Sequence, residues 1–339
     1  MTYKTVTFIA LGSAILVMFV LNLLWGAVHI PVRTVMQIIA GDDTVNATWR
    51  FIVLQFRLPL ALTALLAGGA LAVCGLLMQA VFKNPLADPS ILGVSSGAGL
   101  GVAVVMLFFG GGLVVDGLSV AGFMAAILAA LMGAITVTLI MLVISNIVGN
   151  SSLLLIAGVM VGYLTSSLIM LLNFSATDDG LRSYMYWGMG NFSSVSLKLQ
   201  PMFSVVIAAS MAISLLLIKP LNLNILGDKY AQNLGVNTRR LRTSVLLLTG
   251  IMTAVVTAFC GPIAFIGLAA PHVSRLLFRT DDYRVLLPAT ILVGSNVALL
   301  CSLLCTLPSN GTLIPVNAVT PFVGVPVILY IMLRKNKSL

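Results

Sequence analysis

Charged side chains are scarce in this sequence. Asp, Lys and Arg together supply only 8% of its 339 residues, and Glu does not occur. A soluble globular domain carries about 25% charged residues. The sequence is instead 60% hydrophobic, and a soluble protein of that composition would have too little polar surface to face water. A lipid bilayer accepts such a surface, so the composition predicts an all-α polytopic membrane protein.

Motifs for catalysis and metal binding are also lacking. The sequence has no G-x-x-x-x-G-K-[ST] phosphate loop, no H-E-x-x-H helix and no Ser/His/Asp constellation. Only two histidines occur, and the four cysteines form no C-x-x-C pair. We therefore expect no enzyme activity, no cofactor and no metal site, and any ATP hydrolysis must come from a separate subunit.

The hydrophobic residues form ten runs, each close to the roughly 20 residues that cross a bilayer. The predicted spans are 8–29, 58–82, 91–109, 119–145, 152–174, 200–218, 243–260, 262–278, 285–305 and 315–333. With the N-terminus inside, this count places 13 basic residues on the inner side and 5 outside, as the positive-inside rule requires. The net charge of +9 is explained in this way, and no nucleic-acid partner is expected.

Acidic residues fall outside the predicted spans. Asp88 lies in a loop, and Asp281 and Asp282 lie at an inner turn. Ion-coupled transporters usually carry charged residues within the membrane, so that class is disfavoured, although sodium sites built from neutral oxygens keep it open.

The longest inner connection covers residues 219–242 and interleaves apolar with polar residues. It is too polar to span the bilayer and too apolar to stay free in water, so it is expected to dock against another protein or the membrane surface. The outer segment 30–56 is expected to form a short amphipathic stretch.

Glycines recur at a spacing of four. Gly93, Gly97 and Gly101 open the third span, and Gly158 and Gly162 repeat the spacing in the fifth. Small residues at this spacing let helix backbones approach closely, which predicts a tightly packed bundle. Ten spans also allow two inverted five-helix repeats, although the two halves show no clear sequence match.

Two long motifs carry a family resemblance. They are RLPLALTALLAGGALAVCGLLMQAVFKNPLADPSILGVSSGAGLG (57–101) and GPIAFIGLAAPHVSRLLFRTDDYRVLLPATILVG (261–294). Shorter matches are YMYWGMG (184–190), LNLNILGDKYAQNLGV (221–236) and PVNAVTPFVGVPVILYIML (315–333). Together they resemble the iron-siderophore and vitamin B12 permeases of ABC importers, in the family's order from residue 57 to 333.

The resemblance implies a single permease domain over 1–339 in the bacterial cytoplasmic membrane, with ten helices. It also implies two cytoplasmic ATPase subunits, a second permease subunit and an extracytoplasmic binding protein. A ferric siderophore is the expected cargo, with haem and cobalamin as alternatives.

The resemblance further implies site residues. Those matching the family's ATPase-coupling helices are Leu223, Leu226, Gly227, Ala231, Leu234 and Gly235. The inner gate corresponds to the turn that contains Asn150 and Ser151, and Gln79 and Asn84 either line the pathway or bridge helices. Arg57 matches an outer arginine that meets carboxylates of the binding protein.

Other outer positions depart from the family's charged pattern. Leu60 replaces an arginine, Ser302 and Thr306 stand where the family often has Asp and Arg, and Leu313 replaces a glutamate. These departures suggest pairing with a different permease subunit rather than with a second copy.

Overall fold

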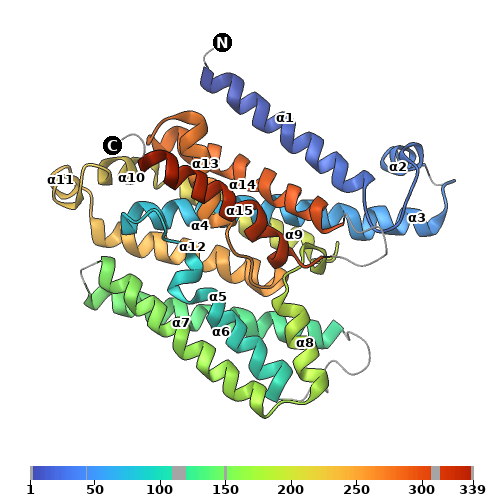
Figure 1. The fold of residues 1–339 in the computed structure, drawn as a ribbon, viewed down its shortest axis with the longest axis horizontal. Coiled ribbons are helices and arrows are strands. Elements are labelled where there is room, and N and C mark those ends of the chain that lie inside the picture. The colour runs from blue at the N-terminus through green and yellow to red at the C-terminus, as the bar shows by residue number, and fades with distance from the viewer. Residues whose placement is uncertain (1–2, 43, 109–119, 149–150, 307–313, 337–339) are drawn as a thin grey trace.

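The computed structural model describes residues 3–42, 44–108, 120–148, 151–306 and 314–336, and every regular element in these ranges is helical (Figure 1). The longer helices are α1 (Tyr3–Leu24), α4 (Leu58–Phe82), α5 (Val94–Ala103), α6 (Val120–Ile147), α7 (Ser151–Phe174), α8 (Asp178–Gly188), α9 (Gln200–Leu215), α12 (Thr238–Cys260), α13 (Ile266–Phe278), α14 (Tyr283–Cys305) and α15 (Val316–Asn336). The shorter elements are α2 (Val32–Ile39), α3 (Ala47–Phe51), η1 (Ile52–Arg57), η2 (Pro89–Leu92), η3 (Val104–Phe108), η4 (Phe192–Ser194), α10 (Ile218–Asn224) and α11 (Asp228–Asn233).

The structure confirms the predicted all-α polytopic fold, because each of the ten predicted spans coincides largely with helix. Six helices are long and apolar enough to cross a bilayer by themselves. The pair α9 and α10 forms a seventh candidate span that is bent by 50°, and three shorter apolar helices correspond to the third, eighth and tenth predicted spans. The arrangement as two inverted repeats stays a prediction.

The outer segment before the second span is more helical than the sequence indicated. Besides α2, it contains α3, which continues through the π-helix η1 into α4, so that Ala47–Phe82 forms one helical run of 36 residues. At 1.5 Å per residue this run is about 54 Å long, which exceeds the thickness of a bilayer. Its first turns therefore extend beyond the outer surface, where α2 and α3 lie together at one end of the molecule (Figure 1).

Helix α4 is the centre of the bundle. It packs against α9, α12, α13 and α14, and most of its residues from Ala61 onward are buried. Helix α1 lies at the edge, along α14 (Figure 1). Two amides connect these two helices: Asn22 donates a buried hydrogen bond to the Leu299 carbonyl (3.1 Å), and Asn296 donates one to the Leu11 carbonyl (3.1 Å).

The glycine spacing produces the close packing that it predicted. A Cβ added at Gly101 would overlap the carbonyl oxygen of Ala129 in α6, and one added at Gly133 would overlap the carbonyl oxygen of Gly97. The α5 and α6 backbones therefore touch. Gly158 of α7 likewise lies against the backbone of Leu92.

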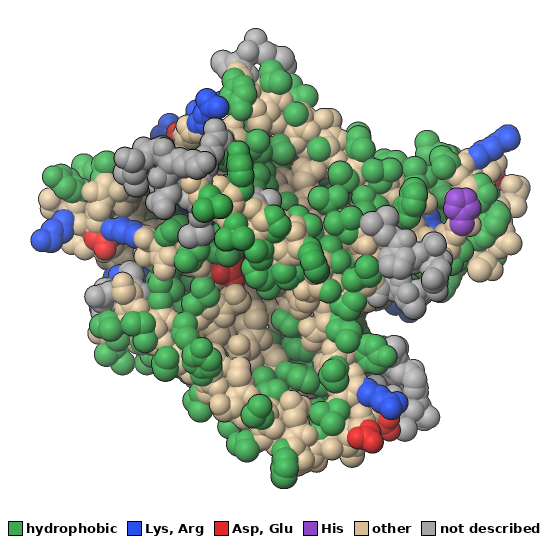
Figure 2. All heavy atoms as spheres, in the orientation of Figure 1, with side chains coloured by type: hydrophobic (Ala, Val, Ile, Leu, Met, Phe, Trp, Pro, Cys, Tyr) green, Lys and Arg blue, Asp and Glu red, His purple; other side chains and the backbone are tan. Residues whose placement is uncertain are grey.

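Polar contacts link the helix ends that were assigned to the inner side. The Tyr3 hydroxyl donates to the Leu277 carbonyl (3.0 Å), and Arg239 donates to the side chain of Asn146 at the end of α6 (3.1 Å). The first contact joins the start of α1 to the end of α13, and the second joins the start of α12 to the end of α6, as the predicted orientation requires. Figure 2 shows hydrophobic side chains across the whole visible face, with basic side chains toward its margins.

One connection departs from the expected simple loop. After α4 ends at Phe82, residues 83–93 turn back along the helices, with Ala87 and Pro89 buried and Lys83, Pro85, Leu86 and Ser90 exposed. A Cβ added at Gly267 in α13 would overlap the Asp88 carboxylate and would lie 2.9 Å from the Leu71 carbonyl oxygen of α4. Asp88 therefore keeps its predicted place in a loop, but this loop contacts α13, and the Asp88 side chain is partly exposed.

Candidate functional site

The inner end of the bundle carries a projecting elbow, which we define as residues 218–236. It comprises α10, a turn, α11 and the following turn (Figure 1). Two glycines make both turns possible: Gly227 has φ of 106° and Gly235 has φ of 85°. Side chains with a Cβ rarely adopt this backbone conformation. Neither glycine has another group within 4 Å of where a Cβ would stand, so backbone conformation rather than space requires glycine.

The elbow presents apolar side chains to its surroundings. Leu226 is 61% exposed and Leu234 is 57% exposed, while Ala231 is fully buried beneath α11. Leu223 is half-buried and lines a cavity of about 410 Å³ with Leu234, Gly235 and residues at the start of α12. The six residues predicted for ATPase coupling thus occupy one small unit, and most of them lie at its surface or in this cavity.

Polar contacts attach the elbow to the membrane helices. Lys83, just after α4, forms an ion pair of 2.6 Å with Asp228 of α11. Asn222 of α10 donates to the Asp282 carboxylate (2.7 Å) and accepts from the Tyr283 backbone N–H (2.8 Å). The Arg284 backbone N–H and the Asn222 amide hold the pKa of Asp282 below its usual range, so this carboxylate stays ionised at neutral pH. These contacts join the elbow to the inner end of α4 and to the start of α14.

Gln79 bridges two helices near their inner ends. Its side chain is buried, accepts a hydrogen bond from Arg275 of α13 (2.7 Å) and donates to the Leu268 carbonyl (3.4 Å). Arg275 also approaches Asp281 at 3.6 Å. This geometry matches the helix-bridging alternative for Gln79, and a role in lining the pathway stays a prediction. The sequence did not predict the hydrogen bond between Gln79 and Arg275, because the two residues lie 196 positions apart and no local pattern connects them.

The predicted gate residues are only partly described. Asn84 accepts a hydrogen bond from the Leu86 backbone N–H (2.9 Å) and lines a cavity of about 280 Å³ against α7. Asn150 lies outside the described residues. Ser151 is the first residue of α7, and its side chain is not described. The gate assignment therefore stays a prediction.

Arg57 has a buried environment. Its guanidinium donates to the carbonyl oxygens of Leu23 (2.8 Å), Leu24 (2.9 Å) and Val28, and only 6% of the residue is exposed. The side chain thus caps the outer end of α1, where helix carbonyls lack partners within the helix. This geometry favours a structural role for Arg57, and docking to a binding protein stays a prediction.

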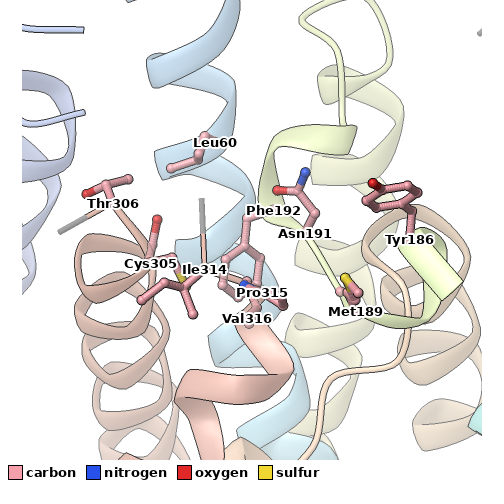
Figure 3. A pocket seen from close by; sticks show the side chains of 12 residues that line it. Leu60, Tyr186, Met189, Asn191, Phe192, Cys305, Thr306, Ile314, Pro315 and Val316 are labelled. Carbon is pink, nitrogen blue, oxygen red and sulfur yellow. The ribbon is translucent and has the colours of Figure 1, made fainter. Parts of the chain in front are cut away.

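An outer pocket of about 170 Å³ brings together three of the positions that depart from the charged pattern. Leu60, Ser302 and Thr306 all line it, whereas Leu313 lies outside the described residues. Figure 3 shows Cys305 and Thr306 on one side of the pocket and Tyr186 and Met189 on the other. None of the lining residues is charged. Tyr186 and Met189 on one side of the pocket belong to the motif YMYWGMG (184–190), for which the sequence predicted no role.

Metal binding has no candidate site in the described part of the chain. No group of three or more His, Cys, Asp and Glu side chains comes together there. His272 makes a helix-end contact instead, because its Nε2 lies 2.9 Å from the Pro85 carbonyl oxygen.

Comparison with known proteins defines the family. Residues 14–334 match the FecCD transport family. The chain belongs to the FecCD transport family. Among similar FecCD-like proteins, the vitamin B12 import system permease protein BtuC of Photorhabdus laumondii is 37% identical over 294 residues, which cover 85% of this chain and 84% of that protein. The corresponding protein of Salmonella paratyphi A is 38% identical over 301 residues, 89% of each chain.

A solved structure shares the FecCD architecture. It is described as an inward-facing conformation of a metal-chelate type ABC transporter. It is similar to this chain with a TM-score of 0.82 and 28% identity, over 96% of this chain and 98% of the other. This FecCD protein is therefore an ABC importer permease, a multi-pass protein of the bacterial inner membrane that works with ATPase subunits and a permease partner. The assignment favours the ATP-driven class over the ion-coupled one.

Proposed function

We propose that this permease carries a ferric siderophore across the cytoplasmic membrane and that two separate ATPase subunits energise it. The likeness over nearly the whole chain to a metal-chelate type ABC transporter is the observation that carries this proposal. An iron chelate is a large cargo with its charge spread over many atoms. The uncharged outer pocket suits a weak contact that passes such a cargo onward instead of retaining it.

Cobalamin is the second candidate cargo, and haem is the third. The relatives named as vitamin B12 permeases favour cobalamin, which is itself a metal chelate. All three cargoes are rigid chelates, so the fold alone does not separate them, and the choice depends on the binding protein that delivers the cargo as well as on this chain.

The elbow is the proposed docking site for an ATPase subunit. Its exposed Leu226 and Leu234 offer apolar contacts, and its cavity of about 410 Å³ suits a partner side chain. Attachment through Lys83 and Asn222 connects this surface to α4 and α14. The proposed single domain, residues 1–339, then includes the coupling segment 219–242 as its inner projection.

The remaining parts of the proposal concern the pathway and the partners. Asn84, Asn150 and Ser151 are proposed to form the inner gate, and an extracytoplasmic binding protein is proposed to deliver the cargo. The second permease subunit is either another copy or a different chain. The neutral residues Leu60, Ser302 and Thr306 support a different chain, because a partner of different sequence would supply the charged docking residues that this chain lacks at these positions.

Uptake by the reconstituted complex tests the cargo. The permease is purified with its ATPase and binding protein, placed in proteoliposomes, and supplied with ATP and radiolabelled ferric siderophore, cobalamin or haem in parallel. We expect accumulation of the siderophore only. Accumulation of cobalamin or haem alone would replace the proposed cargo, and accumulation driven by a proton or sodium gradient without ATP would contradict the coupling mechanism.

A further inference from the structure

The linker between α4 and α5 contains a partly exposed carboxylate that lies well above the inner end of α4. Asp88 lies beside Gly267, and Gly267 lies against Leu71 and Gly75 of α4. At 1.5 Å per residue, the stretch from Leu71 or Gly75 to the inner end of α4 at Phe82 measures about 10 to 16 Å. A carboxylate at such depth in a membrane protein is costly unless a favourable electrostatic partner is present.

The start of α13 supplies such a partner. This helix begins within the bundle, and the preceding residue, Phe265, has φ of 70° and no side-chain hydrogen bond that caps the helix. The first N–H groups of a helix lack acceptors within the helix and carry a partial positive charge. The Asp88 carboxylate lies against this first turn at Gly267. The dipole of α13 favours a negative charge at this position.

Gly267 is what allows this approach. A Cβ at this position would overlap the Asp88 Oδ2 atom, so any larger residue would displace the carboxylate from the helix terminus. The other oxygen, Oδ1, accepts hydrogen bonds from the Ser90 backbone N–H (3.0 Å) and from the Ser90 hydroxyl (2.6 Å). The Asp88 carboxylate thus caps the start of η2 through Ser90 and also contacts the first turn of α13 at Gly267.

A second contact fastens the same linker to the same helix. His272 lies 2.9 Å from the Pro85 carbonyl oxygen, and because a carbonyl can only accept, the imidazole N–H donates. Between the two contacts, Ala87 is fully buried. The linker also borders the cavity of about 280 Å³ next to α7, which Asn84 and Leu86 line.

We propose that Asp88 is a positioning residue that anchors the linker 84–88 to the N-terminus of α13 through its negative charge, and thereby holds Asn84 and Leu86 at the inner mouth of the pathway. The role for Asn84 rests on the proposed function of the chain. The anchoring itself does not, because it concerns only the arrangement of the linker and α13.

Cysteine accessibility tests the anchor in the complete complex. The four native cysteines are buried, so an Ala87→Cys variant reports on the linker against a low background. Inside-out vesicles are treated with a membrane-impermeant maleimide, and uptake is measured in parallel. Asp88→Asn keeps the shape of the side chain but removes its charge. Asp179→Asn is the matched control, since Asp179 is an exposed carboxylate in the first turn of α8.

We expect Asp88→Asn to raise the labelling rate of the thiol introduced at position 87 about tenfold, the size expected for loss of a partly buried charge at a helix terminus, and to lower uptake. Gly267→Ala should do the same by displacing the carboxylate, Ser90→Ala should have a smaller effect, and Asp179→Asn should have none. Unchanged labelling in Asp88→Asn would overturn the proposal, even if uptake falls. If the Asp88→Asn protein does not accumulate in the membrane, the Ser90→Ala variant serves as the test instead. Unchanged labelling of the thiol at position 87 in Ser90→Ala would also overturn the proposal. A complex that takes up none of the three chelates would refute the proposed function and leave the labelling result intact.

Discussion

Lys83 and Asp228 are 145 residues apart in the chain, yet they form an ion pair of 2.6 Å that joins the inner end of α4 to the elbow. Both side chains are about half exposed, and an exposed pair contributes at most about 1 kcal/mol to stability. Its importance in the proposed mechanism is mechanical, because α4 is the central helix of the bundle and the elbow is the proposed ATPase site.

The first prediction concerns this ion pair. Lys83→Asp places two like charges together and should lower the uptake per ATP hydrolysed by roughly fivefold, which corresponds to about 1 kcal/mol. The exchanged double variant Lys83→Asp/Asp228→Lys should recover most of the loss. Uptake and ATPase activity measured in the same proteoliposomes give this ratio. Equal ratios in the single and double variants would show that the pair does not transmit coupling.

A second prediction concerns the backbone of the elbow. Gly235 has φ of 85° and open space around it, so Gly235→Ala costs about 1 to 2 kcal/mol of backbone strain without a steric clash. We expect uptake per ATP to fall roughly five- to thirty-fold, with normal insertion into the membrane. Gly188→Ala is the control, because Gly188 also has open space but ends helix α8 without a positive φ. Intact coupling in Gly235→Ala would contradict the assignment of residues 219–242.

A third prediction distinguishes a structural role of Arg57 from a role in docking the binding protein. Arg57→Ala removes the donor for two carbonyl oxygens at the end of α1 and for the Val28 carbonyl in the following segment, and we expect a loss of about 3 kcal/mol in the free energy of unfolding. The melting temperature of the purified permease should therefore fall by several degrees. Arg182→Ala removes an exposed arginine and should leave it unchanged. An unaltered melting temperature together with weaker capture of the binding protein would instead support docking by Arg57.

The contact between α5 and α6 gives a fourth prediction. Gly133→Ala forces a Cβ into the Gly97 carbonyl oxygen, and overpacking of this kind typically costs about 1 to 3 kcal/mol. The variant should melt at a lower temperature and accumulate less in the membrane. Gly12→Ala in α1 meets nothing within 4 Å and should behave as the unaltered protein does. Similar melting of all three would show that the two helices separate easily.

The membrane spans were predictable because hydropathy depends on composition alone. The second span, 58–82, coincides with α4, and the short eighth span is explained by Gly261 and Pro262 before α13. The spacing of Gly97 and Gly101 likewise indicated close packing, although the partner helix, α6, appears only in the structure.

Parts of the candidate site could not be predicted, because they depend on contacts between residues that are far apart in the sequence. The linker that contains Asp88 reads as a polar inner loop, and only its contact with Gly267 reveals that it turns back along the helices. Arg57 reads as a free outer charge, but the end of α1 surrounds it. In both cases the decisive neighbour lies on another helix, at a distance along the chain that no local pattern encodes.

The bond from Asn22 to the Leu299 carbonyl also has a consequence for biosynthesis. The amide belongs to α1, whereas its acceptor on α14 is synthesised 277 residues later. Until then α1 lacks this neighbour, so it reaches its final packing position only after α14 has been synthesised. Truncated nascent chains that stop before residue 299 should therefore leave α1 free to diffuse or to be captured by insertion factors.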